Sequence, residues 1–200
     1  MRKILIGIFT AGLVFATSGF IKVGFHLLKA ELAQELLASA WEKSKRIDVD
    51  SIIEKPWPWA DTWPVLNIEF PSIDLSSIVL KDTSGESLAF GPGLMTPDIL
   101  PGEKGNSFIA AHRDTHFKSI GLLKLGEQIL IENTQGETLE FIIDQIQIVD
   151  SDKQYPITYM LQRRVTLVTC YPFATTVANS PLRYLVSGLL LDRDDRDGVI

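Results

Sequence analysis

The chain has 200 residues, a formal net charge of −6, and 19 lysines and arginines scattered along its length. Because these cations form no basic stripe, the composition gives no electrostatic case for a nucleic-acid partner. A single cysteine excludes an intramolecular disulfide. The length suits one anchoring segment and one domain of roughly 140 residues, which is large enough to bury a core without metals or disulfides.

The N-terminus has the pattern of a membrane anchor. Arg2 and Lys3 precede an uncharged, mostly apolar run from Ile4 to Ile21, which would rise about 27 Å as a helix, close to the thickness of a bilayer core. The positive charges before the run predict a cytoplasmic N-terminus and an exported remainder. A cleaved signal peptide is the alternative, but Ala16–Gly19 is a poor cleavage site. We therefore predict an uncleaved, single-pass transmembrane anchor over residues 1–28.

The segment from Phe25 to Arg46 contains neither proline nor glycine. Its apolar residues recur at helical spacing, with charged residues between them: Leu28, Leu32, Leu36 (or Leu37) and Ala40. This pattern predicts an amphipathic helical stalk over residues 29–50. We interpret its apolar face as packing on the following domain or on lipid headgroups, rather than as a dedicated partner helix.

A segment rich in tryptophan and proline opens the predicted domain, which we assign to residues 51–200. Residues Lys55 to Pro64 hold three of the four tryptophans and three of the ten prolines, so they form neither a regular helix nor a central strand. We interpret this segment, called here the aromatic strap, as packing over the end of a barrel rather than as a ligand cage.

Short β-prone runs alternate with turn signals through the rest of the chain. The predicted strands are Val65–Phe70, Ile78–Leu80, Ser87–Phe90, Ser107–Ala111, Gln128–Glu132, Thr138–Val149, Arg164–Thr169 and Arg183–Leu191. The residues from Glu132 to Glu137 are typical of a hairpin. Short strands without a long helix predict an all-β domain, built as an antiparallel sandwich or barrel.

The only cysteine, Cys170, ends the β-branched run Val165–Thr169 and precedes Tyr171-Pro172. Free cysteine is among the most buried residue types, so an inert core thiol is one interpretation. The other is a reactive thiol, because proline stops strand pairing and a side chain at such a strand end can face a groove.

A cysteine nucleophile needs a proton partner or a positive field. The predicted domain has two histidines: His112 ends an apolar, strand-like run as Cys170 does, and His116 falls in the following loop. Both histidines are therefore candidate proton partners for the thiol. Because His112 and Cys170 both end strand-like runs, they can meet at one rim of a sheet. Asp114 between the histidines suggests a metal site, but without a third spaced ligand or a nearby cysteine we predict none.

Arg183 is the third candidate. A proline-bearing loop, Tyr171–Ser180, separates Cys170 from the strand that begins at Arg183. If the two flanking strands pair antiparallel, Cys170 and Arg183 become cross-strand neighbours at one rim. A guanidinium there can stabilise a thiolate, bind a substrate carbonyl or hold a developing oxyanion. An ordinary surface arginine at a strand end is the alternative.

Several segments together resemble a known family. Thr166-Leu167-Val168-Thr169-Cys170 resembles the TLxTC signature of sortases, the membrane-anchored cysteine transpeptidases. The agreement extends through most of the domain, and the chain is most similar to sortases of Gram-negative bacteria (class GN), near class D. The further matching segments are Trp57–Pro64, Leu88–Gly93, Ala111–Phe117, Thr169–Phe173 and Pro181–Tyr184.

The resemblance implies a closed eight-stranded sortase β-barrel with a catalytic site of Cys170, His112 and Arg183. It implies cleavage of an LPxTG-like C-terminal sorting signal between Thr and Gly through a thioacyl-enzyme, followed by transfer of the product to an amine. Cofactors are not required. The expected location is the inner (cytoplasmic) membrane, with the catalytic domain facing the periplasm.

Substrate contacts are expected at Thr169, Ala111 and Leu94. The sequence departs from the family pattern at two places: Leu94 stands where histidine is expected, and Ala174–Ser180 lacks the expected glycines. Both departures bear on peptide preference rather than on the reaction. The alternatives are an L,D-transpeptidase-like cysteine enzyme acting on peptidoglycan and a non-catalytic anchored β domain that binds a partner protein through its aromatic strap.

Overall fold

The computed structural model describes residues 31–45, 53–153, 158–174 and 180–191. The chain divides into two compact units, residues 1–36 and residues 37–200. Of the first unit, the described residues 31–36 are helical. Within the described ranges, no helix is long and apolar enough to cross a membrane. The anchor predicted for residues 1–28 lies outside the described residues.

A helix covers residues 31–44, inside the predicted stalk. In the part that belongs to the second unit, Leu37 is fully buried and Trp41 is nearly so. Lys45, at the end of the helix, contacts the carboxylate of Glu132 at 3.4 Å. The amphipathic pattern thus buries its apolar positions in this unit, as predicted.

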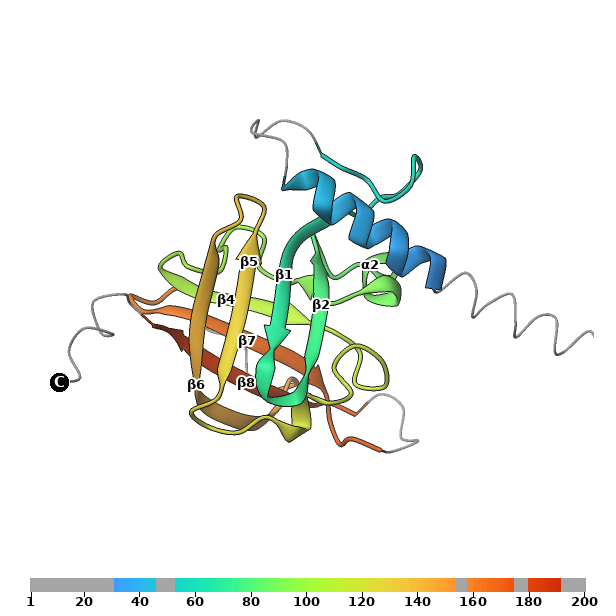
Figure 1. The fold of residues 1–200 in the computed structure, drawn as a ribbon. Coiled ribbons are helices and arrows are strands. Elements are labelled where there is room, and N and C mark those ends of the chain that lie inside the picture. Colours follow the sequence, from blue (N-terminus) through green and yellow to red (C-terminus); the bar gives the residue numbers. More distant parts are fainter. Residues whose placement is uncertain (1–30, 46–52, 154–157, 175–179, 192–200) are drawn as a thin grey trace, which may run out of the picture. The chain divides into compact units, whose positions relative to one another are not determined.

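Eight strands of the described residues close into a barrel (Figure 1) with the order β1-β2-β3-β4-β7-β8-β6-β5. Most neighbours pair antiparallel, while β2–β3 and β4–β7 pair parallel. The strands are β1 Pro64–Phe70, β2 Leu75–Leu80, β3 Gly93–Leu94, β4 Gly105–Ala110, β5 Gln128–Asn133, β6 Thr138–Asp150, β7 Arg163–Cys170 and β8 Leu182–Leu190. This architecture confirms the predicted eight-stranded barrel and excludes the sandwich.

Apolar side chains at alternate strand positions fill the interior of the barrel. On β1, Leu66, Ile68 and Phe70 are buried, and the side chains between them face outward, as the period of two requires. The loops also contribute to the core, because Phe117 is fully buried and packs edge-on against Phe70 with ring centroids 6.5 Å apart. Burying each such side chain stabilises the fold by about 1.5–3 kcal/mol.

The predicted strand Ser87–Phe90 is wrong: these residues belong to a short helix, α2, Gly85–Phe90. The hydroxyl of Ser84 accepts a hydrogen bond from the Ser87 N–H at 3.1 Å and caps the helix. Strand β3 was absent from the prediction because it has only two residues. Its Gly93 is required sterically, since a Cβ there would collide with the carbonyl of Asp82.

The aromatic strap packs on the domain through some of its rings. Trp57 meets Phe90 of α2 edge-on, with centroids 4.9 Å apart. The ring of Trp63 lies 4.1 Å from the ammonium of Lys81, a cation–π contact. Trp59, in contrast, is 79% exposed. The strap therefore covers α2 and the end of β2, with one ring left in solvent.

Candidate active site

Strands β7 and β8 pair antiparallel with Cys170 directly opposite Arg183. This register confirms the cross-strand placement predicted from the sequence. Cys170 is half-buried. The guanidinium of Arg183 donates to the carbonyls of Ser180 at 2.6 Å and Leu182 at 3.0 Å. The charged group is thus held at the beginning of β8, beside the end of β7.

The histidine segment joins the same rim from the other side of β7. Strands β4 and β7 pair parallel with Ala110 opposite Val168, and the Ala111 N–H donates to the Val168 carbonyl at 3.1 Å. The same register, continued by two residues, places His112 level with Cys170. Because β4, β7 and β8 are neighbours in the barrel, the three predicted catalytic residues lie at one rim.

The loop that follows β4 holds the backbone of His112 in place. The N–H groups of Thr115 and Phe117 donate to the His112 carbonyl at 3.4 and 3.1 Å. Phe117 and Ile120 anchor this loop in the core, where both are fully buried. The His112 side chain itself is exposed. A fixed backbone with an exposed imidazole suits a group that must reach both a thiol and a substrate.

His116 occupies a different environment. Its side chain is partly buried, and burial lowers its pKa, as does the neighbouring His112, while a hydrogen bond to the backbone of Ala89 in α2 opposes the shift. His116 therefore connects the histidine loop to α2 rather than continuing the β4 register toward Cys170. Among the described residues, no group of three or more His, Cys, Asp or Glu side chains is placed to hold a metal ion.

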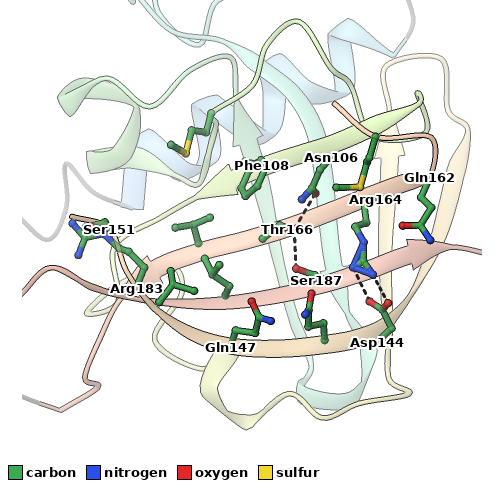
Figure 2. A pocket seen from close by; sticks show the side chains of 16 residues that line it. Asn106, Phe108, Asp144, Gln147, Ser151, Gln162, Arg164, Thr166, Arg183 and Ser187 are labelled. Carbon is green, nitrogen blue, oxygen red and sulfur yellow. Dashed lines mark hydrogen bonds and ion pairs between the residues drawn. The ribbon is translucent and has the colours of Figure 1, made fainter. Parts of the chain in front are cut away.

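A groove of about 910 Å³ opens on the outer face of the barrel at this rim. Figure 2 shows Arg183 and Ser151 at one end of the groove and Arg164 with Asp144 at the other. Thr166 and Val168 of β7 line it. Because side chains alternate along a strand, Cys170 is the next residue of β7 on this face. The lining reaches Val168, one alternate position before Cys170, and includes neither Cys170 nor His112.

The chemistry of the groove changes along its length. Near the thiol it is lined by apolar side chains, Val168 and Leu185. Further away Thr166 donates to Asn106 at 2.9 Å and lies 2.8 Å from the hydroxyl of Ser187.

At the far end of the groove, Arg164 forms a bidentate ion pair with Asp144. Arg164 stands six residues before Cys170 on β7, roughly 20 Å at about 3.3 Å per residue. The groove is thus long enough for an extended peptide of roughly six residues.

The three residues predicted to contact substrate lie elsewhere. Thr169, Ala111 and Leu94 are 2%, 6% and 2% exposed, and none of them lines the groove. The hydroxyl of Thr169 donates to the Ala111 carbonyl at 2.7 Å, and Leu94 belongs to the core. Their side chains are thus buried in or beside the core, and their contact with substrate stays a prediction.

Of the residues that line the groove, only Arg183 was among the predicted site residues. Counting alternate positions back from Cys170 along β7 gives Val168, Thr166 and Arg164, which all line the groove. The same count forward from Arg183 gives Leu185 and Ser187. The sequence therefore contained a usable signal, which needed only the assumption that Cys170 faces outward.

A thiol, an imidazole and a guanidinium near one end of a peptide-sized groove are the groups that a cysteine acyl-transfer enzyme needs. In such an enzyme a thiol serves as nucleophile, an imidazole can move protons, and a guanidinium can hold a developing oxyanion. A family model described as the sortase domain matches residues 68–191. The chain belongs to the sortase family of cysteine transpeptidases, which confirms the resemblance found in the sequence.

Individual relatives agree with this assignment. The chain is 33% identical to Sortase D of Bacillus subtilis (strain 168) over 122 residues, which cover 60% of this chain and 61% of that protein. It therefore spans about three fifths of the length of that relative. It is 27% identical to Sortase A of Listeria monocytogenes serovar 1/2a (strain ATCC BAA-679 / EGD-e) over 187 residues, or 84% of this chain and 83% of that one.

A solved structure shows the same fold. The Clostridium perfringens Sortase D5 transpeptidase superposes with a TM-score of 0.62 at 20% identity, covering 80% of this chain and 96% of that chain. At this identity the similarity concerns the fold alone. Together with the similarity to Sortase D, it agrees with the class D-like character inferred from the sequence.

Proposed function

We propose that this protein is a membrane-anchored sortase that cleaves an LPxTG-like sorting signal between Thr and Gly and joins the new carboxyl end to an amine. The observation that carries the proposal is the register of β4, β7 and β8, which brings His112, Cys170 and Arg183 to one rim. Family membership and the groove that leads to this rim support it.

In the proposed first half-reaction the Cys170 thiolate attacks the carbonyl carbon of the Thr–Gly bond. The carbon–sulfur bond forms as the carbonyl electrons move to oxygen. Protonated His112 gives its proton to the leaving glycine amine as the carbon–nitrogen bond breaks. The product is a thioacyl-enzyme, with the acyl group held as a thioester on Cys170.

In the second half-reaction an incoming amine attacks the thioester. Neutral His112 takes the proton from this amine, the carbon–sulfur bond breaks, and the Cys170 thiolate returns with a protonated His112. The cycle returns Cys170 and His112 to the protonation states in which they began, and the proposed scheme requires no cofactor.

Arg183 would hold the oxyanion that forms in both half-reactions. In the free protein its guanidinium donates to the carbonyls of Ser180 and Leu182. Both of these bonds are made by Nη1, so the Nε and Nη2 donors are the ones that we propose bind the substrate oxygen. The planar fork of the guanidinium allows it to keep its backbone contacts while it binds the oxyanion.

The groove would hold the acyl side of the sorting signal. Its apolar part near Val168 and Leu185 suits the leucine and proline of the motif. Its polar part around Thr166 and Asn106 lies further from the thiol and suits peptide backbone and polar side chains that precede the motif. We propose this orientation because the residues that define the signal lie on the acyl side of the bond that is cut.

The proposed location is the inner membrane, with the barrel facing the periplasm. Its support is the sequence: Arg2 and Lys3 before the apolar run Ile4–Ile21 favour an N-terminus that stays in the cytoplasm.

Turnover of defined peptides tests the proposed reaction. The purified enzyme is mixed with a fluorescent LPxTG peptide and triglycine, and the products are identified by mass spectrometry. We expect cleavage after Thr and a Thr–triglycine product, both absent in Cys170→Ala. Inactivity on this peptide together with cross-linking of peptidoglycan stem peptides would support the L,D-transpeptidase alternative and contradict the proposal.

A further inference from the structure

Arg113, the residue after His112, carries a charged side chain that is unusually enclosed for its place in a loop. The side chain is only 10% exposed. Its Nη1 donates to the carbonyl of Pro172 at 2.9 Å, and its Nε lies 3.4 Å from the carboxylate of Asp114, which is 72% exposed. Burying a guanidinium is unfavourable unless it is hydrogen-bonded or paired. These contacts therefore fix where Arg113 lies.

The two ends of this contact are adjacent to the catalytic residues. Arg113 follows His112 directly, and Pro172 lies two residues after Cys170. The hydrogen bond thus joins the segment that presents the imidazole to the segment that presents the thiol.

The paired register of β4 and β7 ends at Ala110 and Val168. Beyond this point the Thr169 hydroxyl connects the two strand ends on the core side through a hydrogen bond to the Ala111 carbonyl. The hydrogen bond from Arg113 to the Pro172 carbonyl connects the segments that follow these strand ends.

A third contact lies deeper in the same loops. The ring of Phe173 packs so closely on Gly121 that a Cβ there would come within 2.9 Å of it. Phe173 also packs edge-on against Tyr184 of β8, with centroids 5.1 Å apart. The loop after Cys170 is thus held by apolar contacts further along, while Arg113 supplies a polar contact between the residues that follow the two catalytic side chains.

We infer that Arg113 is a positioning residue that sets the distance between the His112 imidazole and the Cys170 thiol. This inference rests on the proposed function, in which His112 exchanges a proton at the reacting centre. Proton transfer requires heavy atoms within about 2.6–3.2 Å, and a misplacement of about 1 Å can reduce a rate about 10²-fold. If the histidine loop were held only by Phe117 and Ile120 in the core, the exposed imidazole of His112 would not be positioned this precisely.

Arg113 acts through His112 rather than on the substrate. Its side chain is only 10% exposed, and its guanidinium contacts Pro172 and Asp114. The two arginines therefore have separate roles: Arg183 lines the groove proposed to receive the peptide, and Arg113 links the segment that carries His112 to the segment that carries Cys170.

The first test is Arg113→Gln in the full-length enzyme, with kcat and KM measured on the LPxTG peptide and triglycine. We expect kcat to fall about 10–100-fold, within the range that misplacement produces, while KM changes less than about 3-fold. Lys118→Gln, which removes an exposed cation from the same loop, is the matched control and should keep the wild-type kcat. An unchanged kcat in Arg113→Gln overturns the inference.

A double-mutant cycle separates positioning from an independent effect. If Arg113 acts through the imidazole, Arg113→Gln should slow the His112→Ala enzyme less than about 2-fold, although it slows the wild type strongly. Multiplicative losses would show that Arg113 acts independently of His112 and would overturn the inference. Arg113→Lys keeps a donor for the Pro172 carbonyl and should recover part of kcat. A folded Arg113→Lys that is as slow as Arg113→Gln would contradict the proposed role of this hydrogen bond.

Labelling of the thiol keeps the inference testable without a substrate. The pH profile of Cys170 alkylation by iodoacetamide should shift in Arg113→Gln toward the profile of His112→Ala, because both weaken the thiol–imidazole contact. A profile identical to wild type overturns the inference. If the wild-type enzyme turned over no sorting peptide, the proposed function would fail, while the alkylation profiles would still decide the role of Arg113.

Discussion

The guanidinium of Arg183 is the residue-scale feature on which the proposed chemistry depends most directly. It sits opposite Cys170 and donates to two backbone carbonyls of its own segment. An arginine held only for structure would be satisfied by these bonds. An arginine that also lines a groove and lies opposite a thiol can in addition bind a substrate held there.

We expect Arg183→Ala to lower kcat about 10²–10³-fold, the loss seen when one oxyanion donor is removed. Arg183→Lys should restore little, because an ammonium lacks the planar fork. Rates on the labelled peptide with triglycine measure both effects. Near-wild-type activity of Arg183→Ala would contradict the proposed role of the cross-strand pair.

The two histidines should differ in their effect on the rate. His112→Ala should lose about 10²–10⁴-fold, the usual contribution of general acid–base catalysis, because the β4 register leads to Cys170. His116→Ala should lose far less, since His116 bonds to the backbone of Ala89. If the two substitutions were equally damaging, the assignment of the base to His112 would be wrong.

At the scale of elements, His116 lies partly buried where the histidine loop meets α2, and this burial should make stability depend on pH. Burial lowers the pKa of His116 in the folded state from its ordinary value of 6.5. The unfolded chain therefore binds more protons as the pH falls through that value, so the free energy of unfolding decreases toward acid pH.

Urea unfolding at pH 7 and at pH 5.5 measures this effect. The wild type should lose stability between the two conditions, and His116→Gln should lose less, because it removes the histidine that titrates differently in the two states. Equal losses for the two proteins would show that another group accounts for the pH dependence.

The sequence predicted seven of the strands well, because their alternating apolar residues and turn signals are local properties. The α2 segment was misassigned because Leu88, Ala89 and Phe90 are compatible with a strand, and the Ser84 cap that decides for a helix is a single hydrogen bond. The two-residue β3 is defined by its neighbours, Leu80 and Ala110, rather than by its own sequence.

The site was predictable as far as backbone register decides it. Cys170 and Arg183 could be placed opposite each other because antiparallel pairing fixes which residues meet. The substrate contacts expected at Thr169, Ala111 and Leu94 stay predictions. The sequence did not show that these side chains are buried, or that the Thr169 hydroxyl turns inward to the Ala111 carbonyl.

At the scale of the whole molecule, the proposed anchor predicts that the N-terminal segment remains attached. The intact mass of protein purified from membranes should correspond to a chain that retains the run Ile4–Ile21, because Ala16–Gly19 is a poor cleavage site. A mature chain beginning near Gly19 or Phe20 would contradict the anchor and leave the transpeptidase proposal intact.

The thioacyl-enzyme is the species that tests the central claim most directly. The enzyme is mixed with an LPxTG peptide in the absence of an amine, quenched with acid, and its intact mass is measured. The account predicts an adduct equal to the peptide up to Thr, located on Cys170, released by hydroxylamine, and absent in Cys170→Ala. Peptide cleavage that proceeds equally in Cys170→Ala, without any adduct on the wild type, would contradict it.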